Sequence, residues 1–236
     1  MRISNREFNK RRKDLMVQME SNSIALLSSA PPSVRNNDAE YQYRQNSDFF
    51  YLTGFAEPNA LLALIPRRRQ GEVVLFCQEK DKEKELWTGY ILGPDAAIEE
   101  LGVDDAYPID DIDDIITGLI EGRDRVYYSM GKDDDFDNCV MEWVKVIRSK
   151  AKIGSHPPSE FQVVDHLLHE LRLHKSSTEI KLMEKFLEPT GNVSVNIWDE
   201  KLTFIPNQVI NNGLEISAAP IIEITFTAEE KGKYYW

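Results

Sequence analysis

Apolar and polar positions follow helical spacing at the start of the chain and strand spacing soon afterwards. Residues 4–19 place apolar side chains at intervals that share one helical face, and Ser4 and Glu7 have the spacing of a capping box. Gly and Pro residues separate the later apolar runs, which have the length of strands. These runs occupy 23–29, 48–53, 60–66 and 72–77. The last two predict a hairpin.

Helical and strand patterns then alternate as far as residue 173. Pro94 and Gly102 bracket a predicted helix over 95–101, because Pro is favoured at the start of a helix and Gly just past its end. Residues 125–129 predict a strand. Further helices are predicted at 111–121, 135–147 and 161–173. Such alternation is typical of an α/β domain, so we expect a mixed β-sheet flanked by helices.

The C-terminal part of the chain has a different composition. Ser176 and Glu179 have capping-box spacing, which predicts a new helix that meets the preceding one at a corner. From Pro189 onward, short runs of Ile, Val, Thr and Phe alternate with turn residues. We therefore divide the chain into an α/β domain, a linker helix and a short β-rich tail, with the bounds 1–174, 175–187 and 188–236.

The charge balance excludes several classes of partner. The chain has 40 Asp and Glu against 28 Lys and Arg, a formal net charge of −12. Because this charge repels phosphate and anionic lipid, we expect neither nucleic acid nor a membrane as a partner. Cys77 and Cys139 belong to no CxxC or Cys/His cluster, which argues against structural zinc and disulfides. With no signal peptide and no bilayer-length apolar run, the protein is expected to be soluble and cytoplasmic.

Familiar catalytic motifs are absent, and two weaker candidates remain. GxSxG, GxxxxGK[ST], GxGxxG and HExxH do not occur. His166 and His169 lie at i and i+3 on a predicted helix, where two imidazoles can share a metal or simply occupy the surface. Residues 104–137 hold twelve acidic side chains against three basic ones. They lack the Gly and Glu offsets of a calcium loop, so we interpret them as a solvated acidic face.

A polar segment that leads directly into an aromatic run is more informative. Its members are Tyr43, Arg44, Gln45, Asn46 and Asp48. Two interpretations stay open: these side chains anchor a loop by satisfying backbone groups, or they line a groove that receives a substrate or partner. Trp87 lies on a predicted loop, and because a Trp is costly to expose, such a residue usually covers something.

Four segments carry a resemblance to a known family. They are EFNKRRKDL from residue 7, AEYQYRQNSDFFYLTGFAEPNALL from residue 39, ELWTGYILGPDAA from residue 85 and HELRLHKSSTEIKLM from residue 169. From about Ile3 to Leu187 the chain resembles the N-terminal domain of bacterial Xaa-Pro aminopeptidase (aminopeptidase P) of the creatinase/prolidase superfamily. The resemblance implies a two-domain metallopeptidase that releases the N-terminal residue of peptides with proline at the second position. Its pita-bread catalytic domain holds two manganese ions through two Asp, one His and two Glu.

The tail does not supply that ligand set. No histidine follows His174, and Asp199 is the only aspartate after Glu188. We therefore expect this chain alone to be non-catalytic and to carry no cofactor of its own. The origin of residues 188–236 stays open between a foreign appendage, a frameshifted or rearranged end of a truncated enzyme, and a genuine alternative domain.

The resemblance also implies what the domain contributes. In the family this domain mediates assembly into dimers or tetramers, and Trp87 matches a Trp that restricts access to the active site of a neighbouring subunit. Asp38 matches a nearby acidic position. Lys152 stands where the family has an Arg, and Lys lacks the bidentate fork of Arg. The alternatives are a stand-alone oligomerisation or regulatory module that binds intact aminopeptidase subunits, and an independent enzyme built on the acidic face or the two histidines.

Overall fold

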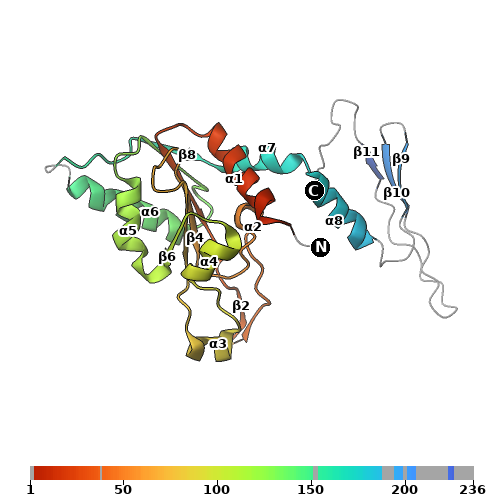
Figure 1. Cartoon of the computed structure of the whole chain (residues 1–236), viewed down its shortest axis with the longest axis horizontal. Helices are drawn as coiled ribbons and strands as arrows, with labels where there is room; N and C mark the ends of the chain where they lie inside the picture. The colour runs from red at the N-terminus through yellow and green to blue at the C-terminus, as the bar shows by residue number, and fades with distance from the viewer. Residues whose placement is uncertain are drawn as a thin grey trace. The chain divides into compact units, whose positions relative to one another are not determined.

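The computed structural model describes residues 3–37, 39–150 and 154–187 and the backbone of three further strands, with side chains up to Met183 except that of Thr88. The chain divides into two compact units, one of Ser4–Leu171 and one of Met1–Ile3 together with Arg172–Trp236. The first unit contains (Figure 1) α1 (Asn5–Gln18), β1 (Ser23–Ser28), β2 (Val34–Asn36), β3 (Ala39–Glu40), α2 (Ser47–Thr53), β4 (Leu61–Leu64), β5 (Val73–Cys77), α3 (Lys82–Thr88), α4 (Pro94–Leu101), β6 (Asp105–Pro108), η1 (Ile109–Asp111), α5 (Ile112–Ile120), β7 (Arg125–Tyr128), α6 (Asp134–Ser149), β8 (Glu160–Val163) and most of α7 (Asp165–Leu173).

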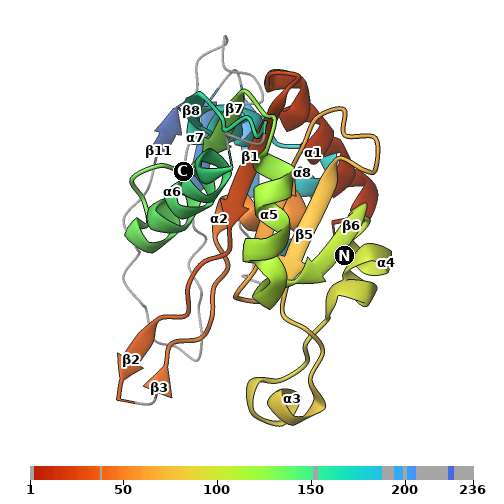
Figure 2. The ribbon, with the colours of Figure 1, turned by 90° about the vertical axis from the view of Figure 1, so that its left-hand side faces the viewer.

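A six-stranded mixed sheet forms the middle of the first unit, with the strand order β6-β5-β4-β1-β7-β8. Within it, β4 runs antiparallel to both neighbours, β1 and β5. The pairs β1–β7, β7–β8 and β5–β6 are parallel (Figure 2). The predicted mixed sheet and the predicted hairpin, which is β4–β5, are therefore confirmed. Every residue of β4 and β5 is buried, as expected for strands that are covered on both faces.

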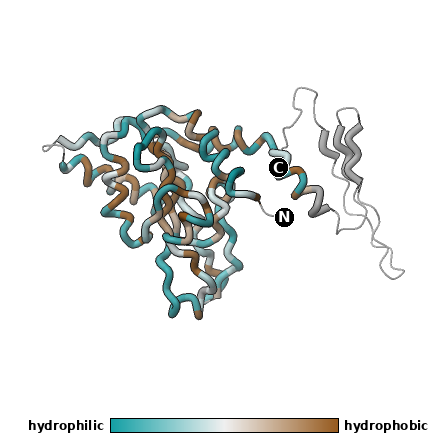
Figure 3. The backbone as a smooth tube through the Cα atoms, in the orientation of Figure 1, coloured by the Kyte–Doolittle hydropathy of each residue, from teal (hydrophilic) through white to brown (hydrophobic). Residues whose placement is uncertain are grey.

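Helices cover both faces of the sheet. Successive residues of a strand point to opposite sides, so strands that are apolar throughout present an apolar surface on each face. Along β1, Ala25 and Leu27 belong to one core and Ile24 and Leu26 to the other. Residues of α1, α2, α4 and α7 contribute to the first core, and residues of α5 and α6 contribute to the second. In Figure 3 the tube of the surrounding helices alternates between hydrophilic and hydrophobic colours, as expected for helices with one face on a core. The result is a three-layer α/β unit.

Arg12 of α1 is among the largest fully buried side chains, and it ties α1 to two other helices. Its guanidinium donates to the carbonyl oxygens of Leu52 at 2.9 Å, Leu101 at 3.1 Å and Gly102 at 3.0 Å. These oxygens lie at the C-terminal ends of α2 and α4, where carbonyls lack intrahelical partners and carry partial negative charge. Burial lowers the pKa of Arg12 to about 10, and the charge of Asp104 opposes this. Arg12 is therefore charged at neutral pH.

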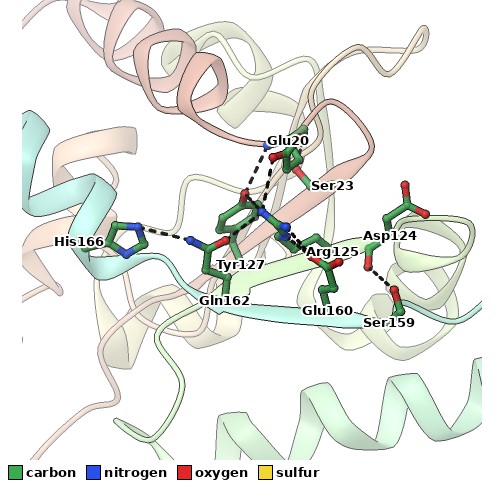
Figure 4. A network of polar contacts seen from close by, with 9 residues as sticks. All are labelled: Glu20, Ser23, Asp124, Arg125, Tyr127, Ser159, Glu160, Gln162 and His166. Atoms are coloured by element: carbon green, nitrogen blue, oxygen red, sulfur yellow. Dashed lines mark hydrogen bonds and ion pairs between the residues drawn. The ribbon is translucent and has the colours of Figure 1, made fainter.

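A polar network fastens the edge strand β8 to β7 (Figure 4). Arg125 of β7 donates through Nε to Glu160 at 2.7 Å. Through Nη1 it donates to the Tyr127 hydroxyl and to Gln162 Oε1, both at 3.1 Å. The hydrogen bonds to Tyr127 and Glu160 raise the pKa of Arg125. Because an edge strand has a neighbour on one side only, these side chains add to the backbone pairing of β8.

The strand predicted over 48–53 is wrong, because this segment forms helix α2. The side chain of Asn46 accepts hydrogen bonds from the N–H groups of Asp48 and Phe49, and Gly54 ends the helix in the left-handed conformation. Asn before a helix and Gly after it are strong boundary signals. Here the two caps outweighed the aromatic, strand-like composition between them.

The predicted start of the helix over 161–173 is also wrong. Residues 160–163 pair with β7 as strand β8, and α7 begins only at Asp165. The capping box expected at the start of α1 does not form, because the side chain of Ser4 makes no capping hydrogen bond. Glu7 instead lies 3.6 Å from Arg11 in an ion pair one helical turn away.

The second unit contains α8 (Ser177–Leu187) and a three-stranded antiparallel sheet of order β11-β10-β9. The capping box predicted for α8 is confirmed, since Ser176 N–H donates to Glu179 Oε2 at 2.8 Å and Glu179 N–H donates to Ser176 Oγ at 3.2 Å. The tail strands are β9 (Ser194–Trp198), β10 (Lys201–Ile205) and β11 (Glu223–Thr225). Among the described helices, none has the length and apolar character that a bilayer span requires.

Replacement of the buried guanidinium should destabilise the first unit. Arg12→Ala leaves one buried and two partly buried carbonyl oxygens without their donor, so we expect the free energy of unfolding in urea to fall by about 3 kcal/mol. Arg6→Ala, which removes an exposed Arg from the same helix, should change it by less than about 0.5 kcal/mol. Equal urea midpoints for the two variants would contradict this assignment.

Candidate functional site

Two segments project from the same end of the first unit (Figures 1 and 2). The ribbon arm, residues 34–37 and 39–41, follows β1 and contains the paired strands β2 and β3. The helical arm, residues 81–90, follows β5 and contains α3. Because β1 and β5 both run antiparallel to β4, their carboxyl ends lie at the same edge of the sheet. The sheet topology therefore brings together two arms that are far apart in the sequence.

Local capping shapes the helical arm. The side chain of Asp81 accepts hydrogen bonds from the N–H groups of Glu83 at 2.8 Å and Lys84 at 3.3 Å and so begins α3. Gly89, with a φ of 86°, ends the helix, and its N–H donates to the carbonyl of Glu85 at 3.1 Å. A helix of only seven residues is marginal by itself. Its position must therefore come from contacts at the base of the arm.

Large apolar side chains are exposed on both arms. The exposed fractions are 65% for Val34, 60% for Tyr41, 83% for Leu86, 91% for Trp87 and 64% for Tyr90. Solvent contact at this many large side chains is unfavourable, and a concentration of them marks an interaction surface. The two arms are the strongest candidate for a functional surface in the described part of the chain.

Trp87 does not lie on a loop, as the sequence suggested, but in the last turn of α3. Its side chain is 91% exposed, and the expectation that Trp87 covers something therefore stays a prediction. Its neighbour Leu86 is exposed as well. Asp38 and Lys152, the other two residues of the predicted access site, lie outside the described residues.

The polar segment after the ribbon arm holds backbone groups. Gln45 Oε1 accepts from the N–H of Ala30 at 2.9 Å, and Gln45 Nε2 donates to the carbonyl of Glu57 at 2.8 Å. The Tyr43 hydroxyl donates to the carbonyl of Ala30 at 2.9 Å. Asn46 caps α2, and Arg44 is exposed. These contacts correspond to the anchoring interpretation of the segment.

The two histidines of α7 point to different neighbours. His166 lies 3.5 Å from the side-chain nitrogen of Gln162. His169 lies 3.9 Å from a carboxylate oxygen of Asp48, and these two residues form with Asp165 the group whose potential ligand atoms are within 4.8 Å of one another. Sequence spacing did not indicate this grouping, because Asp48 is remote in the chain.

This Asp–His group does not fit a metal site. The ammonium of Lys132 pairs with the carboxylate of Asp165, which also accepts from the Ser129 hydroxyl at 3.2 Å. A cation would have to displace a positive charge that is already in place. The group is better described as a polar contact between α2, α7 and the loop before α6.

Several members of the acidic stretch have structural partners. The side chain of Asp133 caps α6, and Asp113 accepts a hydrogen bond from Trp143 Nε1 at 2.7 Å. A hollow of about 820 Å³ lies between α6 and the base of the helical arm. Its lining includes Lys80 and Lys84 as well as Asp110 and Asp113, so its charge is mixed and indicates no single class of ligand.

The exposure of Trp87 predicts a contrast between two tryptophans. Trp87→Ala should change the free energy of unfolding in urea by less than about 0.5 kcal/mol, because the side chain contributes little to the core. Trp143→Ala should reduce it by about 3 to 5 kcal/mol, because Trp143 is 5% exposed. A loss for Trp87→Ala as large as that for Trp143→Ala would show that Trp87 packs within its own chain.

Comparison with known proteins places this arrangement in a family. The model of the family "Aminopeptidase P, N-terminal domain" matches residues 8–127. The Xaa-Pro aminopeptidase of Escherichia coli is 39% identical over 190 residues, which cover 80% of this chain and 43% of that protein. The mitochondrial intermediate cleaving peptidase 55 of Arabidopsis thaliana is 31% identical over 186 residues, which cover 76% of this chain and 34% of that protein.

Solved structures show the same fold. The aminopeptidase PepP of Pseudomonas aeruginosa has a TM-score of 0.76 at 53% identity, with 84% of this chain and 46% of that chain covered. The E. coli aminopeptidase P has a TM-score of 0.77 at 39% identity, with 80% and 43% covered. The chain thus spans less than half the length of these relatives. It belongs to the family of the aminopeptidase P N-terminal domain.

Proposed function

We propose that this chain is the non-catalytic assembly and substrate-access domain of an Xaa-Pro aminopeptidase. The observation that carries the proposal is the 91% exposure of Trp87 on one of two arms that project from the same end of the first unit and carry exposed apolar side chains, in a chain that belongs to this family. A second subunit would cover these side chains and would receive Trp87 near the entrance of its active site. The relatives named above are peptidases, which favours a domain of an enzyme over a free-standing regulatory module.

In this proposal the chemistry belongs to a downstream domain. That domain would hold two manganese ions and would release the residue before a proline at the second position of a peptide. The solved structures include one described as a zinc-substituted E. coli aminopeptidase P in complex with product, so a metal is part of that relative. In the Asp48–Asp165–His169 group, the carboxylate of Asp165 is already paired with the ammonium of Lys132, so this group is unsuited to hold a metal ion.

The proposal also covers organisation and location. Residues 1–174 would act as the assembly domain and residues 175–187 as the helix that leads to the next part of the enzyme, while residues 188–236 would not take part in peptide hydrolysis. The assembled species would be a homo-oligomer, a dimer or a tetramer, in the cytoplasm. The free thiols of Cys77 and Cys139 support a reducing compartment.

The purified chain should not hydrolyse peptides. With Mn²⁺ and an Xaa-Pro-Xaa peptide we expect no turnover, because the residues after His174 include no histidine and one aspartate, Asp199. The intact P. aeruginosa enzyme is the positive control in the same liberated-amine assay. Turnover by the purified chain that a chelator abolishes would overturn this part of the proposal.

Association with intact subunits should depend on Trp87. In sedimentation with the P. aeruginosa enzyme, which is 53% identical over the shared region, we expect mixed oligomers. Trp87→Ala should weaken them at least about tenfold, because aromatic anchors dominate interface energies. Val17→Ala is the matched control, since Val17 is 84% exposed and belongs to α1, which is part of neither arm. The proposed role would be contradicted if Trp87→Ala and Val17→Ala bound the P. aeruginosa enzyme equally well. It would also be contradicted if the wild-type chain did not bind that enzyme.

A further inference from the structure

Two carboxylates hold the base of the helical arm. As the chain returns from the arm to the core, the N–H of Ile91 donates to Glu85 Oε1 at 3.1 Å and the N–H of Leu92 donates to Glu57 Oε1 at 2.9 Å. Ile91 is 3% exposed and Leu92 is 7% exposed. Consecutive backbone amides are thus bound by carboxylates from two different segments, at the point where the exposed arm meets the buried core.

Glu57 also contacts the segment that descends from the ribbon arm. Its backbone carbonyl accepts from Gln45 Nε2 at 2.8 Å, and Gln45 Oε1 accepts from the N–H of Ala30 at 2.9 Å. Ala30 precedes the ribbon arm and Gln45 follows it, so one side chain closes the base of that arm. Through its carbonyl and its carboxylate, Glu57 is therefore bonded to the base of both arms.

The carboxylate of Glu57 is in an unfavourable environment. Its Oε2 atom is buried and has no hydrogen-bond partner among the described residues. Burial raises the pKa of Glu57, the Leu92 N–H bond opposes this, and the negative charge of Glu85 adds to it. Burial and, to a smaller extent, the negative charge of Glu57 raise the pKa of Cys77 in β5 to about 12. A half-buried carboxylate with one unsatisfied oxygen is costly near a second negative charge, and its presence here points to a positional role.

The neck of the helical arm is narrow. A Cβ atom on Gly93, which has a φ of 78°, would lie 3.1 Å from Lys80 Cβ. The segment that enters the arm and the segment that leaves it are therefore in close contact at the neck. Between Lys80 and Gly93, the arm contains one short helix, α3. The orientation of Trp87 therefore depends on how tightly the neck and the amides of Ile91 and Leu92 are held.

We propose that Glu57 and Glu85 are positioning residues for Trp87: together they clamp the returning limb of the helical arm and fix this arm relative to the ribbon arm. The inference rests on the proposed function for its consequence, since a partner would meet Trp87 in the clamped orientation. The clamp itself concerns this chain alone and is measurable without any partner.

The clamp is tested by amide hydrogen exchange on the full 236-residue chain. Glu57→Ala and Glu85→Ala should lower the protection of the Leu92 and Ile91 amides, respectively, by about ten- to a hundredfold, the range expected for hydrogen bonds to charged acceptors. Glu57→Gln and Glu85→Gln should retain most of the protection, because an amide oxygen still accepts the bond. Glu83→Ala is the matched control, an exposed Glu on the same helix.

Amides of β5 report global unfolding in the same experiment, because every residue of that strand is buried. If Glu57→Ala also lowers the protection of the β5 amides, that variant has unfolded globally. The comparison of Glu85→Ala with Glu85→Gln then tests the clamp. Unchanged protection at residues 91 and 92 in the Ala variants, with β5 intact, would overturn the clamp. So would equal losses in the Ala and Gln variants.

Association with the intact P. aeruginosa enzyme separates the clamp from the proposed function. If Trp87→Ala and Glu57→Ala both weaken association while Glu83→Ala does not, positioning is supported. If Trp87→Ala weakens association but Glu57→Ala lowers protection without any effect on it, positioning is overturned. Reduced protection with no association by any variant, the wild type included, would support the clamp and contradict the proposed function.

Discussion

The buried guanidinium of Arg12 is the contact on which the arrangement of the first unit depends. It brings positive charge to the carbonyl ends of α2 and α4, which would otherwise be desolvated without partners. Each of these helices follows one of the arms in the chain, α2 after the ribbon arm and α4 after the helical arm. A single side chain of α1 thus fixes the two elements to which the arms return.

Net charge and exposed surface act in opposite directions in the proposed assembly. Two copies of a chain with a formal charge of −12 repel each other at long range. The exposed apolar side chains of the arms act only at contact, where their removal from water is favourable. Association of two such chains therefore depends on whether a few apolar side chains of the arms fit against the partner. This fit requires that the arms have a defined orientation.

Much of the layered fold was predictable because its signals are local. Apolar runs between Gly and Pro indicated β1, β4 and β5, and Pro94 with Gly102 indicated α4. The error at α2 shows two local signals in conflict, since Asn46 and Gly54 already marked a helix around an aromatic run. The error at β8 is different in kind. Its strand conformation comes from pairing with β7, and no pattern within four residues specifies a partner.

The family, the α/β class and the interest of Trp87 could be predicted without coordinates, because they depend on residue types in order along the chain. The exposure of Trp87, the departure of the two arms from the same end of the sheet and the contacts of Glu57 with the base of both became visible only in the folded chain. Exposure and long-range hydrogen bonds depend on which distant segments the packed sheet brings together, and residue spacing does not encode those distances.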